Sequence, residues 1–97
     1  MERLEFEYPA KRPVPHRAHV GVVGSGDLEV LLEPIQGCVA HVFVQTSVGG
    51  FAATWKAVLD RFFDKYDGIV RIEINDAGAT PGSVMLRLWQ AVEMSEQ

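Results

Sequence analysis

The stretch "VGVVGSGDLEVLLEP", residues 20–34, contains two apolar segments separated by a Gly-Ser-Gly tripeptide. Apolar segments that flank a glycine-rich turn are typical of a β-hairpin. We therefore expect one strand over residues 18–23 and an antiparallel partner over residues 28–33. The rest of the fold is built outward from this hairpin.

The register of the hairpin follows from which residues must share a face. A three-residue loop, Gly24 to Gly26, pairs apolar residues on one face: Val22 with Leu28, Val20 with Val30 and Ala18 with Leu32. A two-residue loop would instead set valines against Asp27 and Glu29. Because the buried face decides the register, we expect the three-residue loop, with Gly26 in the left-handed conformation and Ser25 at the apex.

Three further segments alternate between apolar and polar residues, the pattern of strands with one buried face. They are residues 4–8, 39–46 and 69–75. The segment between the first strand and the hairpin, residues 9–18, contains three prolines, so we expect a loop there.

Two segments change to helical spacing. An apolar stripe begins at Phe51 and continues through Trp55, Val58, Leu59, Phe62, Phe63 and Tyr66. Asp67-Gly68 is a suitable stop, with the glycine left-handed. Thr80 can cap a last helix and Pro81 suits its first position, and its stripe consists of Val84, Leu88 and Val92.

The expected order is therefore strand, hairpin, strand, helix, strand, helix. This order predicts an α+β fold, a two-layer sandwich of a mostly antiparallel sheet with both helices on one face. A chain of 97 residues has the length of one domain, so residues 1–97 are expected to form a single domain.

Composition excludes several function classes. The net charge of −4 argues against a protein that binds nucleic-acid phosphates. No apolar segment approaches the ~20 residues of a membrane span, and the N-terminus lacks the order of a signal peptide. One cysteine permits no internal disulfide. We expect a soluble, cytoplasmic protein that binds neither nucleic acid nor membrane.

Most reactive side chains have ordinary structural explanations. Cys38 is expected to be a small buried apolar residue, and His41 a satisfied or exposed strand residue. No Ser-His-Asp arrangement or zinc spacing is present, so no catalytic or metal-binding residue is expected. Gly49-Gly50 precedes a helix, where phosphate binding and a flexible turn are both open explanations.

Ser25 differs because of its setting. A serine between two glycines at a hairpin apex has an exposed hydroxyl and no neighbouring base in sequence except Asp27. This setting suits modification by another enzyme better than nucleophilic attack by the serine itself. Judged from the turn alone, an ordinary tight turn is the favoured explanation.

Three segments of the sequence are informative when they are taken together and in this order: "VGVVGSGDLEVLLEP", "VQTSVGGFAATW" and "DAGATPGSVMLRL". Together they resemble the acyl carrier subunit, or δ subunit, of bacterial malonate decarboxylase, over about residues 2 to 92. The resemblance implies that Ser25 carries 2'-(5''-phosphoribosyl)-3'-dephospho-CoA through a phosphodiester bond. Gly24, Gly26 and Asp27 would then support the attachment loop.

The resemblance also implies partners and a cycle. The thiol of the group is acetylated, an acyl-transferase subunit exchanges acetyl for malonyl, and a decarboxylase subunit releases CO2. A separate prosthetic-group transferase attaches the group, and the carrier itself supplies no catalytic residue. The tether raises the effective concentration of the acyl group at each site.

Some alternatives stay open. A citrate-lyase-type acyl carrier bears a similar group, and an unmodified α+β ligand- or protein-binding module needs no group at all. The basic loop that contains Lys11, Arg12 and Arg17 could meet the phosphates of the group or a partner subunit. Trp89 either docks a partner or covers the edge of the core.

Overall fold

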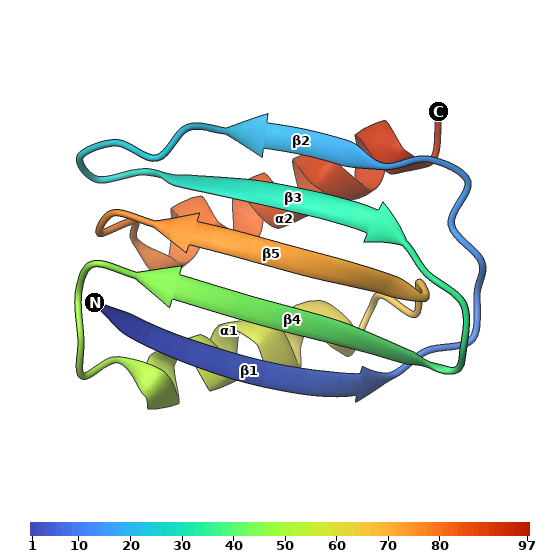
Figure 1. Cartoon of the computed structure of the whole chain (residues 1–97), viewed down its shortest axis with the longest axis horizontal. Helices are drawn as coiled ribbons and strands as arrows, with labels where there is room; N and C mark the ends of the chain where they lie inside the picture. The colour runs from blue at the N-terminus through green and yellow to red at the C-terminus, as the bar shows by residue number, and fades with distance from the viewer.

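The computed structural model describes residues 1–97 as one five-stranded sheet with two helices (Figure 1). The strands are β1 (Glu2–Pro9), β2 (Ala18–Gly21), β3 (Leu28–Pro34), β4 (Val39–Thr46) and β5 (Val70–Asp76). The helices are α1 (Ala52–Phe63) and α2 (Pro81–Ser95). The predicted order of elements is confirmed.

The sheet has the strand order β1-β4-β5-β3-β2. Three of its four pairings are antiparallel, and only β4 and β5 run parallel. A parallel pair needs a crossover connection, and α1 supplies it. The predicted α+β sandwich with a mostly antiparallel sheet is therefore confirmed.

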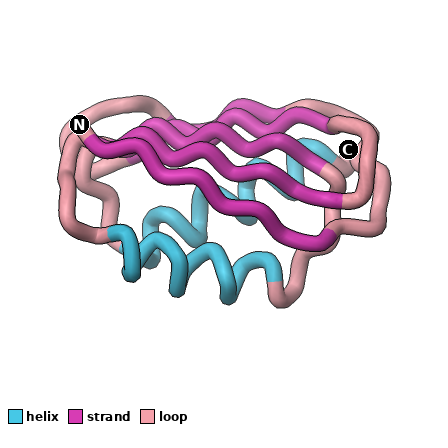
Figure 2. The backbone as a smooth tube through the Cα atoms, turned by 60° about the horizontal axis from the view of Figure 1, so that its bottom comes forward, coloured by secondary structure: helices cyan, strands magenta, loops and turns pink.

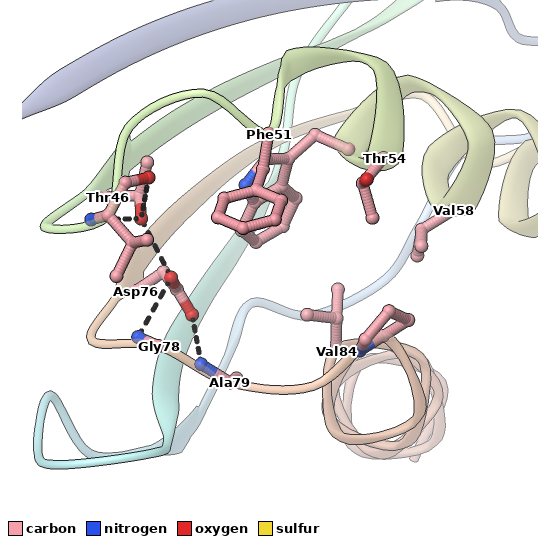
Figure 3. Close-up of a pocket in the computed structure, with 11 residues that line it drawn as sticks. Thr46, Phe51, Thr54, Val58, Asp76, Gly78, Ala79 and Val84 are labelled. Carbon is pink, nitrogen blue, oxygen red and sulfur yellow. Dashed lines mark hydrogen bonds between the residues drawn. The ribbon is translucent and has the colours of Figure 1, made fainter.

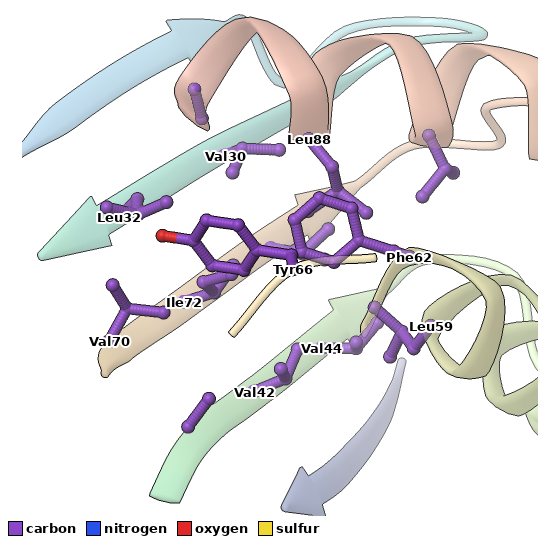
Figure 4. Close-up of a cluster of buried hydrophobic side chains, with 14 of the residues drawn as sticks. Val30, Leu32, Val42, Val44, Leu59, Phe62, Tyr66, Val70, Ile72 and Leu88 are labelled. Atoms are coloured by element: carbon purple, nitrogen blue, oxygen red, sulfur yellow. The ribbon is translucent and has the colours of Figure 1, made fainter. Parts of the chain in front are cut away.

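Both helices pack on one face of the sheet, as predicted (Figure 2). Residues with alternating burial along β3, β4 and β5 direct their apolar side chains to that face. A cluster of 21 buried hydrophobic residues fills the space between the layers, with Phe62, Leu59 and Leu88 fully buried (Figure 4). Full burial of one such side chain contributes roughly 1.5–3 kcal/mol.

The first helix departs from its predicted limits. Phe51 is half exposed and lies just before α1, because the chain is still turning from β4 at that point. The helix ends at Phe63, before the predicted stop, and Gly68 does not have a positive φ. The prediction of Gly68 as a left-handed stop is wrong; instead, the ring of Tyr66 packs where a Cβ on Gly68 would lie.

The second helix begins as predicted. Thr80 is its N-cap, and the Thr80 hydroxyl accepts a hydrogen bond from the Ser83 backbone N–H at 3.2 Å. Pro81 occupies the first helical position. Neither helix is long and apolar enough to cross a membrane.

The hairpin keeps the predicted register but not the predicted loop. Ala18 pairs with Leu32 and Val20 with Val30, as expected. However, β2 ends at Gly21, whose φ of +76° turns the chain off the ladder, so the loop has six residues, 22–27. The prediction that Val22 joins the buried face opposite Leu28 is therefore wrong, and Val22 is 66% exposed.

Candidate functional site

The centre of the loop is a β-turn from Gly24 to Asp27. The Asp27 backbone N–H donates to the Gly24 carbonyl at 2.9 Å, so Ser25 and Gly26 are the two central residues. Gly26 has a φ of +75° and Ser25 does not have a positive φ. This combination defines a type II turn, in which glycine at the second central position avoids steric strain. The predicted left-handed Gly26 is confirmed.

The turn is fixed to the loop between β5 and α2. The Gly26 N–H donates to the Ala77 carbonyl at 2.8 Å, and the Ala77 N–H donates to the Asp27 carbonyl at 2.9 Å. These two bonds continue the pairing of β3 with β5 beyond the ends of the strands. Ser25 therefore projects from a backbone that is held on one side by the sheet.

Asp27 supplies a second anchor through its side chain. Its carboxylate accepts from the Leu28 backbone N–H at 2.8 Å and from the Arg87 Nη2 of α2 at 2.9 Å. The Arg87 hydrogen bond, followed by the Leu28 bond, lowers the pKa of Asp27 below its ordinary value. Because both carboxylate oxygens are engaged, Asp27 supports the turn and is not a free base for Ser25.

Arg87 is a site residue that the sequence reasoning missed. It lies 60 positions from Asp27 along the chain. A single arginine on an amphipathic helix carries no local pattern that identifies its partner. Only the seating of α2 against β2 and β3 brings the two side chains together.

Ser25 is exposed, and the side-chain hydrogen bonds of its turn all involve Asp27. A Cβ added to either neighbouring glycine, Gly24 or Gly26, would meet no atom within 4 Å. The space around the Ser25 hydroxyl is thus open to an approaching enzyme. No group of three or more His, Cys, Asp or Glu side chains is placed to hold a metal ion.

The basic loop lies at the opposite end of the sheet from Ser25 (Figure 1). The length of the seven-residue β3 separates the two ends by about 20 Å. Arg12 is committed to structure there: its Nη1 contacts the Glu96 carboxylate at 2.8 Å, and its Nε contacts Asp67 at 3.2 Å. Lys11 and Arg17 are exposed in the same loop. The structure does not bring this loop together with Ser25.

The remaining candidates have varied surroundings. Cys38 is exposed, so the prediction of a buried residue is wrong; it precedes β4 at the surface. His41 is partly exposed, and its Nδ1 lies 3.4 Å from the Glu7 carboxylate on the neighbouring strand. Trp89 covers the core edge against the Phe62 ring, with centroids 4.9 Å apart, and keeps 36% of its surface exposed.

The start of α1 does not present a free phosphate site. Gly50 has a φ of +87°, which fits the turn explanation for the glycine pair. Its N–H already donates to the Glu2 carboxylate at 3.3 Å. A carboxylate at this position repels a phosphate.

A cavity of about 320 Å³ lies at the same end of the sheet as Ser25, between the start of α1 and the β5–α2 loop (Figure 3). Its walls include Trp55, Val58 and Val84. At its edge, Asp76 accepts from the Thr46 hydroxyl at 2.8 Å and from the backbone N–H groups of the β5–α2 loop at 2.9 and 3.0 Å. Sequence reasoning missed this cavity, because the segments that form it are distant in the chain.

Comparisons with known proteins agree on one family. The family model of the malonate decarboxylase delta subunit matches residues 15–95. The malonate decarboxylase acyl carrier protein of Pseudomonas fluorescens is 53% identical over 94 residues, covering 96% of this chain and 95% of the relative. The protein of the same name from Azotobacter vinelandii is 50% identical, with the same coverage.

A solved structure agrees with these sequence matches. One chain of a Pseudomonas malonate decarboxylase hetero-tetramer, crystallised in complex with malonate, is similar with a TM-score of 0.92 and 53% sequence identity. The similarity covers 97% of this chain and 98% of the other. By its sequence and its fold, this chain belongs to the malonate decarboxylase delta subunit family.

Proposed function

We propose that this chain is the acyl carrier subunit of a malonate decarboxylase, and that it carries acetyl and malonyl thioesters on a group attached to Ser25. The exposed Ser25 hydroxyl, at the tip of an anchored turn, is the observation that carries the proposal. The names of the relatives support the carrier role. The chain itself performs no catalytic step.

The proposed group is 2'-(5''-phosphoribosyl)-3'-dephospho-CoA, joined through a phosphodiester. The residues of the turn fit such a group, because nothing covers Ser25 and both flanking positions lack side chains. Arg87 is the cation in the hydrogen-bond network of the turn, and it is already paired with Asp27. The charge of the phosphodiester is therefore left to solvent. When bound, the group supplies the thiol that forms the thioester.

The role of the protein is to hold the attachment point still while a flexible arm moves. The turn has main-chain bonds to Ala77 and a side-chain bond to Arg87, which restrict motion of the Ser25 backbone. A fixed origin keeps the acyl group at a high effective concentration near each partner. The proposed partners are the acyl-transferase and decarboxylase subunits and a prosthetic-group transferase.

The proposal places the protein in the cytoplasm. Cys38 is a free, exposed thiol. Such a thiol persists most readily in a reducing compartment. The proposed partners include no nucleic acid and no membrane.

Intact mass spectrometry tests the proposal. The chain is coexpressed with the enzymes that synthesise and attach the prosthetic group, and we expect one addition of the mass of the group. The Ser25→Ala variant should lose the addition completely. Ser47→Ala is the matched control, since Ser47 is an exposed serine that directly follows β4, bonded to Asp76 at the same end of the sheet, and should keep the addition.

Three outcomes would contradict the proposal. Absence of any addition to the wild-type chain favours an unmodified α+β binding module. An addition that survives in Ser25→Ala places the attachment elsewhere. If the group is attached but the complex turns over citrate rather than malonate, the citrate-lyase-type carrier replaces the proposed function.

A further inference from the structure

The cavity beside the Ser25 turn has no role in the attachment itself. It lies between the first turn of α1, the start of α2 and the ends of β4 and β5. Its volume of about 320 Å³ is at the small end of the range for small-molecule sites. That volume suits the end of an extended ligand better than a whole nucleotide.

A short path of covalent bonds and one hydrogen bond joins Ser25 to the wall of the cavity. Gly26 follows Ser25 and is hydrogen-bonded to Ala77, and Gly78, the next residue, lines the cavity. The bond lengths along this path place the Cα atoms of Ser25 and Gly78 at most about 10 Å apart. An arm that includes a diphosphate and a pantetheine chain is longer than this distance, so its end can return to the cavity.

The lining of the cavity selects for neutral, apolar ligands. Trp55, Val58 and Val84 form buried walls, and Val48 and Phe51 form a more exposed rim. The residues that line the cavity include no lysine, arginine or histidine. A carboxylate that entered would lose its hydration without gaining an ion pair, which is costly.

Asp76 strengthens this selection. Asp76 as a whole residue is 6% exposed, and its carboxylate is already bonded to Thr46, Gly78 and Ala79. It lies just before the α2 N-terminus, where it offsets the partial positive charge that would otherwise attract an anion. A second carboxylate nearby would meet a negative charge rather than a free donor.

We propose that this cavity holds the acetylated end of the arm and excludes the malonylated end. This inference rests on the proposed function, because the occupant is the group attached to Ser25. The acetyl thioester is neutral and small, whereas the malonyl thioester carries a carboxylate. The acetyl form is therefore shielded from water between cycles, and the malonyl form, still attached to the arm, remains outside and accessible to the decarboxylating partner.

Reaction of the thioester with hydroxylamine tests the inference without the partner subunits. The loaded carrier is prepared in a Cys38→Ser background, which removes the exposed thiol of the protein. With acetyl-CoA and malonyl-CoA as references, we expect the acetyl carrier to react about fivefold more slowly than its reference. We expect the malonyl carrier to react within about twofold of its own reference, because its end is not shielded.

A pair of variants on α1 separates the cavity from the rest of the surface. Thr54 lines the cavity and is exposed, so Thr54→Phe fills the space without disturbing the core. It should remove the protection of the acetyl thioester. Ala53→Phe, at the neighbouring exposed position outside the cavity, should keep it.

The outcomes distinguish this inference from the proposed function. Equal protection of both thioesters, or protection that persists in Thr54→Phe, overturns the inference and leaves the attachment at Ser25 intact. An intact mass without any added group overturns both. As a second readout, the tryptophan emission, to which Trp55 in the cavity wall contributes, should change on acetylation and not on malonylation, and unchanged emission in both forms counts against occupancy.

Discussion

The two ends of the sheet are built differently. At one end, the Ser25 turn is anchored mainly by main-chain bonds to Ala77, and its tip and the nearby cavity are open. At the other end, main-chain bonds to Asp67, Ile69 and Ser95 also hold the loop of residues 10–17, but there charged side chains close over the loop as well. Arg12 bridges Glu96 and Asp67 and lies over the Tyr66 ring at 5.6 Å from its centroid.

We call the end of the sheet with the Ser25 turn the presenting end, and the end with the loop of residues 10–17 the closing end. The side chain of Ser25 takes no part in the bonds that hold its turn, so Ser25 can accept a large group without loss of stability. In the loop of residues 10–17, Arg12 is already engaged by two carboxylates, so Arg12 is not available to phosphates. The basic residues that the sequence gathers between Lys11 and Arg17 therefore lie at the end that is not the site.

The largest expected effect on stability comes from a substitution at Gly21, where β2 ends and the loop of residues 22–27 begins. Gly21→Ala places a Cβ against the Leu28 carbonyl at a φ of +76°. We expect a loss of at least about 3 kcal/mol of unfolding free energy, from backbone strain together with a steric clash. Urea denaturation measures this loss.

Gly26→Val is the matched comparison for this strain. Gly26 has a φ of +75° but open space around it, so only the conformational strain of roughly 1–2 kcal/mol is expected. Equal stability of Gly21→Ala and Gly26→Val would contradict the close approach at Gly21.

The next largest effect is expected when the ion pairs of Arg12 at the closing end are removed. Arg12→Ala should lower the unfolding free energy by about 1 kcal/mol, because the Arg12 side chain is 40% exposed and solvent weakens its ion pairs. Arg17→Ala, in the same loop, should change stability by less than about 0.5 kcal/mol. Thermal unfolding of the two variants measures the difference, and similar values for both would remove the distinction between the two ends.

A smaller effect depends on pH at the presenting end. The pKa of Asp27 is lowered by Arg87, so the folded state binds its proton less tightly than the unfolded state does. The stability that this pair contributes is present above the ordinary value of 3.8 and is lost as the pH falls through the lower folded value. The difference in stability between the wild type and Asp27→Asn should therefore shrink below about pH 4, as measured by denaturation at several pH values. A constant difference would show that the pair does not hold the turn.

The smallest effect on folding is expected at the attachment residue itself. Ser25→Ala removes an exposed hydroxyl, so the unfolding free energy should change by less than about 0.5 kcal/mol. The melting temperature of the unmodified protein measures this. A clear fall would mean that Ser25 has a structural contact.

Local periodicity was sufficient to predict the elements of this fold. The strand β4 has the predicted limits, residues 39–46, because its alternation is strict and both of its ends are marked. The start of α2 was predictable because Thr80 and Pro81 are local signals. The pairing of β2 with β3 followed from the requirement that apolar residues share a face.

Features that depend on distant segments were not predictable. The loop around Ser25 has six residues rather than three because β2 already ends at Gly21, and its anchors Ala77 and Arg87 are far along the chain. The end of α1 and the cavity likewise depend on how Tyr66 and the helix starts pack. The position of Ser25 at a turn was predictable, and its supports were not.

Mapping of the attachment site tests the central claim most directly. Trypsin cleaves after Arg17 and Lys56, which releases residues 18–56 from the modified chain. Fragmentation of this peptide should place the whole added mass on Ser25. An added mass on Cys38, Ser47 or Thr54 within the same peptide would contradict the account.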